Sequence, residues 1–296
     1  MAHEFTTGFY TALGTGLQAD GRVQADSLRA QIDDQIAAGA SGLLVMGSMG
    51  IESYIRDRHY VEVAQVGAQQ VKGWVPVMVG VMDTCIGRVL DRIEALKGLP
   101  IDGVVATTPF YNTLTQAEVY TFYSALAKAS PYPVYMYDLA VVTKTAIAYE
   151  TAVRIRSTLP NVRGIKSGNL NLVRSLSLTQ AASNPFSIMY SSLDTFDIAY
   201  RGGITRQLDG MFACTAPLAQ KMYTALRTGD HGQASAALEA IVRIRDVFVS
   251  VGVFTGFTAA MNLLGYAGAF HPDYALEPTA EVRAKVKDAL VTEGLL

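Results

Sequence analysis

One lysine of this sequence ends an apolar segment, a position in which its amine could act as a nucleophile. Lys166 closes the run VRGIK at 162–166, whereas the other seven lysines fall in expected helices or in loops. Burial disfavours a charged ammonium group, and the free amine that remains can attack a ketone to form an imine. The same position also suits a lysine whose charged end extends past the strand into water. The residue alone leaves both interpretations open.

Hydroxyl groups end or follow three other apolar segments. Tyr137 ends PVYMY, Ser48 follows GLLVM, and Tyr111 lies just beyond GVVATT. A phenol next to an imine can pass protons to and from it as a general acid–base, and Ser48 could link Tyr137 to Tyr111 in a relay of hydroxyl groups. Taken alone, Tyr137 also fits an amphipathic tyrosine at the edge of a barrel.

The turn formed by Gly47, Ser48, Met49 and Gly50 suggests how an anion could be bound. Its two glycines allow successive backbone N–H groups to point toward one spot, where they could hold a carboxylate. Glycine-rich turns between a strand and a helix are common, so the turn predicts an anion site only in combination with Lys166 and Tyr137.

Eight short apolar runs alternate with segments of helical periodicity, and these elements must position the side chains. The runs occupy 8–13, 42–46, 75–80, 103–108, 133–137, 162–166, 186–190 and 209–213. The helical segments include 26–38, 56–71, 88–97, 116–129, 149–158, 171–180 and 217–228. The runs are continuously apolar, as in parallel strands that are covered on both faces. The pattern predicts an α/β protein, a (β/α)8 TIM barrel with additional C-terminal helices, whose site lies at the carboxyl ends of the strands.

We expect the barrel to occupy residues 1–230 and a helical extension, 231–296, to pack on it, with a break in that extension at 251–256. An open, doubly wound sheet is the competing fold. It would normally carry a G-x-G-x-x-G turn after its first strand, and the sequence offers only Gly14-Thr15-Gly16 there.

The composition argues against several classes of protein. A net charge of −2 provides no basic surface for nucleic acid or for an anionic membrane, and no apolar run reaches the roughly 18 residues of a membrane span. The two cysteines form no CxxC motif, and the four histidines have no metal-ligand spacing. We therefore expect a cytoplasmic enzyme without a metal site, whose activity survives chelators.

The motifs together resemble the dihydrodipicolinate synthase / N-acetylneuraminate lyase superfamily of class I aldolases, over about residues 8–270. GLLVMGSMG is similar to the G-[ST]-[TS]-G turn of that family, and TTPFYNTLTQAEVYTFY to its P-[YF]-Y segment and the helix that follows. VYMYDLAVVTK resembles the stretch with the catalytic tyrosine, and NVRGIKSGNLN the stretch with the Schiff-base lysine. VGVFTGF at 251–257 is closer to the lyase branch than to the synthase branch.

The resemblance implies a role for each matching residue. Lys166 would form the imine and Tyr137 would shuttle protons. The amides of Ser48 and Met49, next to Gly47, would bind the carboxylate of pyruvate. Tyr111 would reach into the site of a neighbouring subunit, because family members are typically homotetramers built as dimers of dimers. No cofactor is implied beyond the covalent imine through Lys166.

The sequence departs from the family at positions that should face the second substrate. Met49 replaces a hydroxyl residue, and Val142 stands where the synthases have an arginine. Leu193 and Thr195 lie in the segment Ser192–Thr195, which corresponds to the Gly-x-Asp-Glu run of the lyases, with Thr195 in place of the last acid. These replacements predict an aldehyde that is uncharged and largely apolar, unless Lys144 reaches back to supply the missing cation.

These observations favour a lyase, a pyruvate-dependent class I aldolase that forms or cleaves a C–C bond of a 2-oxo acid and has an aldehyde as its other substrate or product. A Schiff-base dehydratase or hydratase-aldolase acting on a 2-oxo-3-deoxy acid would use the same lysine and tyrosine. A barrel that binds a 2-oxo acid without turnover is the non-enzymatic alternative, although such a barrel has no physical reason to keep a buried lysine. A phosphate-binding barrel is disfavoured because no glycine-rich loop follows the seventh strand.

Overall fold

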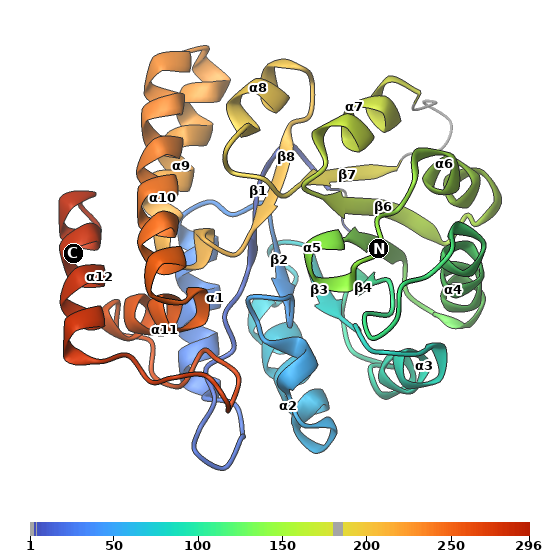
Figure 1. Ribbon diagram of the computed structural model, residues 1–296, viewed down its shortest axis with the longest axis horizontal. Coiled ribbons are helices and arrows are strands. Elements are labelled where there is room, and N and C mark those ends of the chain that lie inside the picture. The colour runs from blue at the N-terminus through green and yellow to red at the C-terminus, as the bar shows by residue number, and fades with distance from the viewer. Residues whose placement is uncertain (1–2, 4, 180–185) are drawn as a thin grey trace.

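Eight parallel strands form a closed barrel in the computed structural model, which describes residues 3, 5–179 and 186–296 (Figure 1). Each strand pairs with its neighbour in the sequence, and β8 pairs with β1 to close the barrel. The strands are β1 (Gly8–Ala12), β2 (Gly42–Val45), β3 (Val77–Gly80), β4 (Gly103–Thr107), β5 (Val134–Asp138), β6 (Val162–Ser167), β7 (Ser187–Tyr190) and β8 (Arg206–Asp209).

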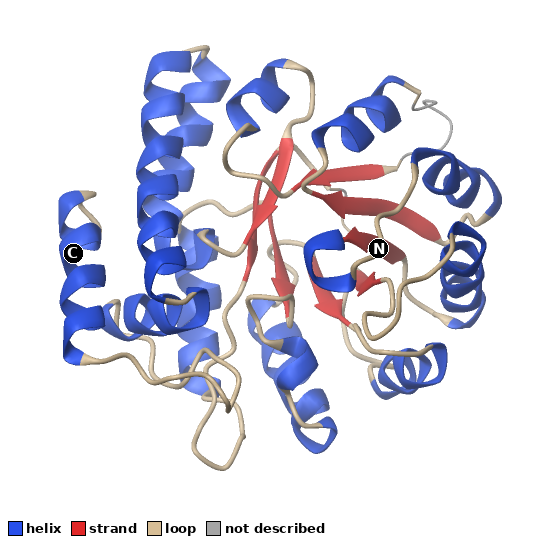
Figure 2. Cartoon of the chain, viewed as in Figure 1, coloured by secondary structure: helices blue, strands red, loops and turns tan. Residues whose placement is uncertain are grey.

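Helices surround the barrel, and further helices follow its last strand (Figure 2). Those of the barrel are α1 (Ala25–Ala37), the short 3-10 helix η1 (Glu52–Tyr54), α2 (Asp57–Val71), α3 (Ile86–Ala95), α4 (Gln116–Ala129), α5 (Ala140–Thr143), α6 (Tyr149–Thr158), α7 (Leu170–Leu178), α8 (Phe196–Arg201) and α9 (Phe212–Thr228). The C-terminal helices are α10 (His231–Val251), α11 (Val253–Leu263) and α12 (Ala280–Thr292). The predicted fold class is confirmed.

Alternate residues of each strand point into the barrel or toward the helices, so the strands bury both of their faces. In β1, Tyr10 and Ala12 belong to the inner cluster, whereas Phe9 packs in the outer cluster. Phe5 lies just before β1 and contacts Tyr10 and Tyr135, with ring centroids 5.8 and 5.2 Å away. These aromatic rings fill the end of the barrel at which the strands begin.

The eighth strand is not where the sequence pattern predicts it. We expect an apolar run at 209–213, but the strand is Arg206–Asp209, and α9 begins at Phe212. Two polar residues conceal this strand in the sequence. Arg206 donates through Nε to the carbonyl of Phe5, and the buried Gln207 donates to the carbonyl of Ser192. These donors therefore have partners inside the fold, although the buried Oε1 of Gln207 has none among the described residues.

The C-terminal extension packs on one side of the barrel through α10, which lies beside α9 (Figure 1). Asp230 begins α10 by accepting a hydrogen bond from the amide of Gln233. The helix ends at Gly252, whose φ of 92° suits glycine, and α11 continues the chain in a new direction. This end falls within the break expected at 251–256. The short helices α5 and α8 are not among the predicted helical segments.

Candidate active site

A cavity of about 750 Å³ lies at the carboxyl ends of the strands, where α10 and α11 border it. Its lining grades from buried to exposed side chains. Lys166 is 6% exposed and Tyr137 4%, whereas Val249 of α10 and Val141 of α5 are 60% and 86% exposed. The cavity therefore has an inner end at the strands and a mouth at the helices, where exposed valines form part of the wall.

Lys166 and Tyr137 face each other at the inner end of this cavity. They are paired across β5 and β6, and the ammonium nitrogen of Lys166 lies 4.0 Å from the centroid of the Tyr137 ring. Among the described residues, neither the Nζ of Lys166 nor the hydroxyl of Tyr137 has a hydrogen-bond partner. Lys166 does not extend into open water, so the alternative of an exposed lysine is wrong.

The turn after β2 presents unpaired backbone N–H groups to the cavity. Ser48 and Met49 both line the cavity, and their backbone N–H groups donate to no acceptor in the part of the chain that is described. Met46 and Ile51 on either side of the turn have φ of 55° and 49°, in the left-handed region that bends the chain sharply. Two free amides beside a buried amine are suited to a carboxylate.

Glycines hold this turn in place by allowing close approach. A Cβ atom on Gly80 at the end of β3 would lie 1.8 Å from the carbonyl oxygen of Met46, and one on Gly210 would lie 2.1 Å from the Cγ of Met49. The side chain of Met49 therefore rests on the backbone after β8. A thioether occupies the space beside Ser48 in which a hydroxyl residue was expected from the family pattern.

Asp209 is a cavity residue that the sequence pattern did not reveal. It ends β8, and its Oδ1 accepts from the amide of Met211 at 2.8 Å. Burial raises the pKa of Asp209, while that amide and the charges of Lys166 and Arg245 act in the opposite direction. The sequence pattern places the eighth strand at 209–213, and Asp209 would then begin the strand. In the structure it ends the strand, at the side of the barrel where the cavity lies.

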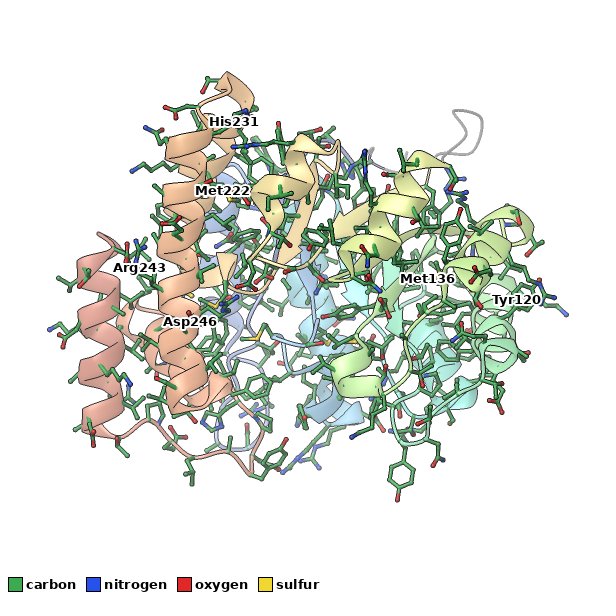
Figure 3. The ribbon with its side chains drawn as sticks, turned by 45° about the horizontal axis from the view of Figure 1, so that its top comes forward. Tyr120, Met136, Met222, His231, Arg243 and Asp246 are labelled. Carbon is green, nitrogen blue, oxygen red and sulfur yellow. The ribbon has the colours of Figure 1, made fainter. Side chains whose placement is uncertain are left out.

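Arg245 of α10 is the second missed residue, and it brings a cation to the wall of the cavity. Its Nη1 lies 2.8 and 2.7 Å from the two carboxylate oxygens of Asp194, which also lines the cavity. Its Nε and Nη2 donate to Oδ1 of Asp246, a neighbour on α10 that Figure 3 labels. Burial opposes the charge of Arg245, but the two aspartates outweigh this effect and raise its pKa.

A helical signal for this wall exists in the sequence. Arg245, Phe248 and Val249 are spaced three and four residues apart, so they share one face of α10, and all three line the cavity. Arg243 lies on the side of α10 next to α12, where it pairs with Glu293 (Figure 3). The spacing of residues in the sequence shows that Arg245 and Arg243 lie on different faces of α10. It does not show which face meets the barrel.

The remaining expected site residues divide into two groups. Leu193 is buried and lines the cavity. Gly47, Tyr111, Val142 and Thr195 do not line it. Tyr111 is 84% exposed, so a relay from Tyr137 through Ser48 to Tyr111 is not formed within one chain.

Two of these positions have other surroundings than expected. The hydroxyl of Thr195 lies 2.5 Å from that of Tyr190 on β7, which directs it away from the cavity. Val142 is half exposed on α5, and Lys144 is exposed just after it, with no part in the lining. Lys144 does not replace the missing arginine in this conformation.

Within 3, 5–179 and 186–296, no three His, Cys, Asp or Glu side chains are grouped so that they could hold a metal ion. Over the same ranges, no helix has the length and apolar character needed to cross a membrane.

A closed barrel of eight parallel strands, with a cavity at their carboxyl ends and a buried lysine inside it, defines the class of (β/α)8 proteins that carry their sites at this end. The chain belongs to the dihydrodipicolinate synthetase family, whose model matches residues 5–293. The family resemblance inferred from the motifs is thereby confirmed.

Relatives of known name are similar over part or all of the chain. The 4-hydroxy-tetrahydrodipicolinate synthase of Porphyromonas gingivalis is 30% identical over 184 residues, which are 62% of this chain and 61% of that relative's length. The synthase of the same name from Acidiphilium cryptum is 27% identical over 98% of this chain and 99% of the relative.

Solved structures match the fold closely at low sequence identity. The Proteus mirabilis N-acetylneuraminate lyase has a TM-score of 0.89 at 20% identity, covering 99% of this chain and 100% of that one. A prophage protein of the dihydrodipicolinic acid synthase family from E. coli K12, solved in complex with pyruvate, has a TM-score of 0.90 at 21% identity, with 99% and 100% coverage.

Proposed function

We propose that this protein is a class I aldolase, a lyase that joins pyruvate to an aldehyde, or releases both from a longer 2-oxo acid, through an imine on Lys166. The observation that carries the proposal is the arrangement at the inner end of the cavity. A buried amine without a hydrogen-bond partner among the described residues lies against a phenol, and two free backbone amides line the same cavity. This arrangement offers a nucleophile, a proton carrier and a carboxylate site together.

Each chemical step has a residue suited to it. The amine of Lys166 attacks the ketone carbon of the 2-oxo acid, and the resulting carbinolamine loses water to give the imine. In cleavage, a proton leaves the hydroxyl on C4, the C3–C4 bond breaks, and its electron pair moves to the imine to form an enamine. The aldehyde is released, C3 takes a proton, and water frees pyruvate. Tyr137 is the residue proposed to exchange these protons.

The mouth of the cavity supports an apolar aldehyde as the second substrate. Val141, Val249 and Val253 surround it, and Phe248 lies behind them. Arg245 and Asp194, the charged residues of this wall, already bind each other, so a long polyol would have to compete with that ion pair for hydrogen bonds. The finer assignment of reaction is our proposal, since the relatives include proteins named as a synthase and as a lyase.

Reductive trapping tests the imine. Incubation with pyruvate and borohydride should add one reduced pyruvyl group, which peptide mapping should locate on Lys166. Lys166→Ala should abolish both the adduct and the activity. Lys144→Ala is the matched control, because Lys144 is exposed and outside the cavity, and it should leave both unchanged. Labelling of a different lysine, or of none with any 2-oxo acid, would contradict the proposal.

A panel of aldehydes tests the second substrate. With pyruvate as the partner, kcat/KM should be highest for benzaldehyde-like and short aliphatic members, and lower for polyol and carboxylated ones, because the mouth provides apolar contacts. A clear preference for a polyhydroxylated or carboxylated aldehyde would show that the apolar wall does not set the specificity.

A further inference from the structure

We infer that the ion pair between Asp194 and Arg245 makes the cavity reject a second substrate that carries a carboxylate. The inference rests on the proposed function, since it concerns the part of the ligand that extends away from Lys166. Asp194 pairs with the guanidinium to which such a carboxylate would bind, and Asp194→Asn would remove the competing charge.

The guanidinium of Arg245 is largely engaged by the protein itself. Its Nη1 contacts both carboxylate oxygens of Asp194, at 2.7 and 2.8 Å, and its Nε and Nη2 donate to Oδ1 of Asp246, at 3.0 and 2.7 Å. The two oxygens of one carboxylate lie too close together for each to receive its own straight hydrogen bond from Nη1, so about three of the five N–H donors are engaged. A substrate carboxylate that approached the Nη1–Nη2 edge for the strong, paired contact that arginine provides would have to share Nη1 with Asp194.

The charges around the cavity also oppose an anion. Among the described lining residues, the cations are Lys166 and Arg245, whereas Asp138, Asp194 and Asp209 carry carboxyl groups. Lys166 is engaged by the imine in the proposed mechanism. A second carboxylate would therefore meet an arginine that two aspartates already neutralise, and its desolvation would not be compensated.

Asp194 and Arg245 differ in exposure and in the contacts that hold them. The side chain of Asp194 is 59% exposed, whereas that of Arg245 is 27% exposed and also held by Asp246. Replacing Asp194 therefore removes one charge from the mouth without releasing Arg245 from its place. The result is a cation beside the cavity whose Nη1 no longer faces a carboxylate, while Asp246 still holds its Nε and Nη2.

Binding of matched ligands tests this inference. The pairs are 2-oxoglutarate with 2-oxopentanoate and 2-oxoadipate with 2-oxohexanoate, in which a terminal carboxylate replaces a methyl group. Calorimetry on the parent should show a preference for the methyl-ended member. Asp194→Asn should shift the affinity ratio toward the dicarboxylate by about tenfold, as expected for one gained hydrogen-bonded charge contact.

Two variants separate the pair from general charge effects. Asp197→Asn removes the same charge from α8, where Asp197 binds Ser235 and does not line the cavity, and it should leave the ratio unchanged. The double variant Asp194→Asn/Arg245→Met should lose the gain. The inference is overturned if the parent already prefers the dicarboxylates, if both single variants shift the ratio equally, or if the gain survives loss of Arg245.

Failure of the proposed function would be visible separately. Trapping of 2-oxopentanoate on Lys166 by borohydride reports the imine and does not involve Asp194. Trapping without a shift in the ratio overturns the inference alone. A shift without trapping supports the role of the ion pair and contradicts the imine, and an absence of binding by every ligand overturns both.

Discussion

Tyr137 carries the proton transfers in the proposed mechanism, and its hydroxyl has no other partner among the described residues. Tyr137→Phe removes this one oxygen while the ring stays packed against Lys166. We expect the fold and the formation of the trapped adduct to persist while kcat falls by about 10²–10⁴-fold, the usual contribution of a general acid–base. Steady-state kinetics and circular dichroism measure the two effects.

Tyr135→Phe is the control for this substitution. Tyr135 lies two residues earlier on the same strand, but its ring packs against Phe5 at the opposite end of the barrel. Its loss of a hydroxyl should leave kcat nearly unchanged. Wild-type turnover in Tyr137→Phe would remove this tyrosine from the mechanism.

The sequence predicts some of the site residues and not others, for physical reasons. Lys166 and Tyr137 are recognisable because a polar group that ends an apolar strand must lie at the barrel edge. Arg245 is one of several charged residues on a long helix, and its place beside the cavity depends on the direction in which α10 crosses the barrel. That direction is set by packing between distant elements, which local spacing does not encode.

At the scale of elements, a buried acid follows the turn that carries Ser48 and Met49. Glu52 in η1 is fully buried and contacts Arg92 of α3. Burial is the larger influence and raises the pKa of Glu52 to about 8, although Arg92 lowers it. Between about pH 4.5 and 8 the folded chain therefore keeps a proton that the unfolded chain releases.

The free energy of unfolding should fall as the pH rises through this window, because the folded state binds more protons there. In the parent, the free energy of unfolding should fall by up to ~1.4 kcal/mol per pH unit. Glu52→Gln cannot ionise at this position, so its free energy of unfolding should not show this fall. Urea unfolding at pH 5 to 8 measures the difference. Glu150→Gln, at an exposed position at the start of α6, should keep the parental slope. Equal slopes in both variants would mean that Glu52 is ionised in the folded protein.

Most elements can be predicted from the sequence, because the spacing of apolar residues and the capping residues indicate the same helices and strands. The helix Gln116–Ala129 matches its expected bounds, and Thr115 and Glu118 form a reciprocal capping box at its start. The strand Arg206–Asp209 is the exception, since Leu208 in the inner cluster is its single apolar residue. Alternation of apolar residues carries no information about a strand of this kind.

At the scale of the molecule, the exposed Tyr111 supports the expectation of a homotetramer, in which it would enter a neighbouring site. Sedimentation should give four times the mass of the chain. Lys166→Ala and Tyr111→Ala should each lower activity strongly, and their co-expression should restore part of it, because some sites would combine an intact lysine with an intact tyrosine. A fully active monomer, or a mixture no better than its parts, would contradict this assembly.

The aromatic rings of Phe5, Tyr10 and Tyr135 close the barrel at the end opposite the cavity. In the proposed mechanism pyruvate is attached to Lys166, and in the described part of the chain the cavity opens past α10 and α11, so both reactants use the same mouth. In cleavage, the aldehyde half lies nearer the mouth of the cavity and is released first. Pyruvate is still attached to Lys166 and is released last. In the direction of synthesis the order is reversed. Pyruvate must bind first, because an aldehyde that binds first obstructs the path of pyruvate to Lys166. The shape of the fold thus sets the order in which the two reactants bind and leave, whatever the rates of the chemical steps.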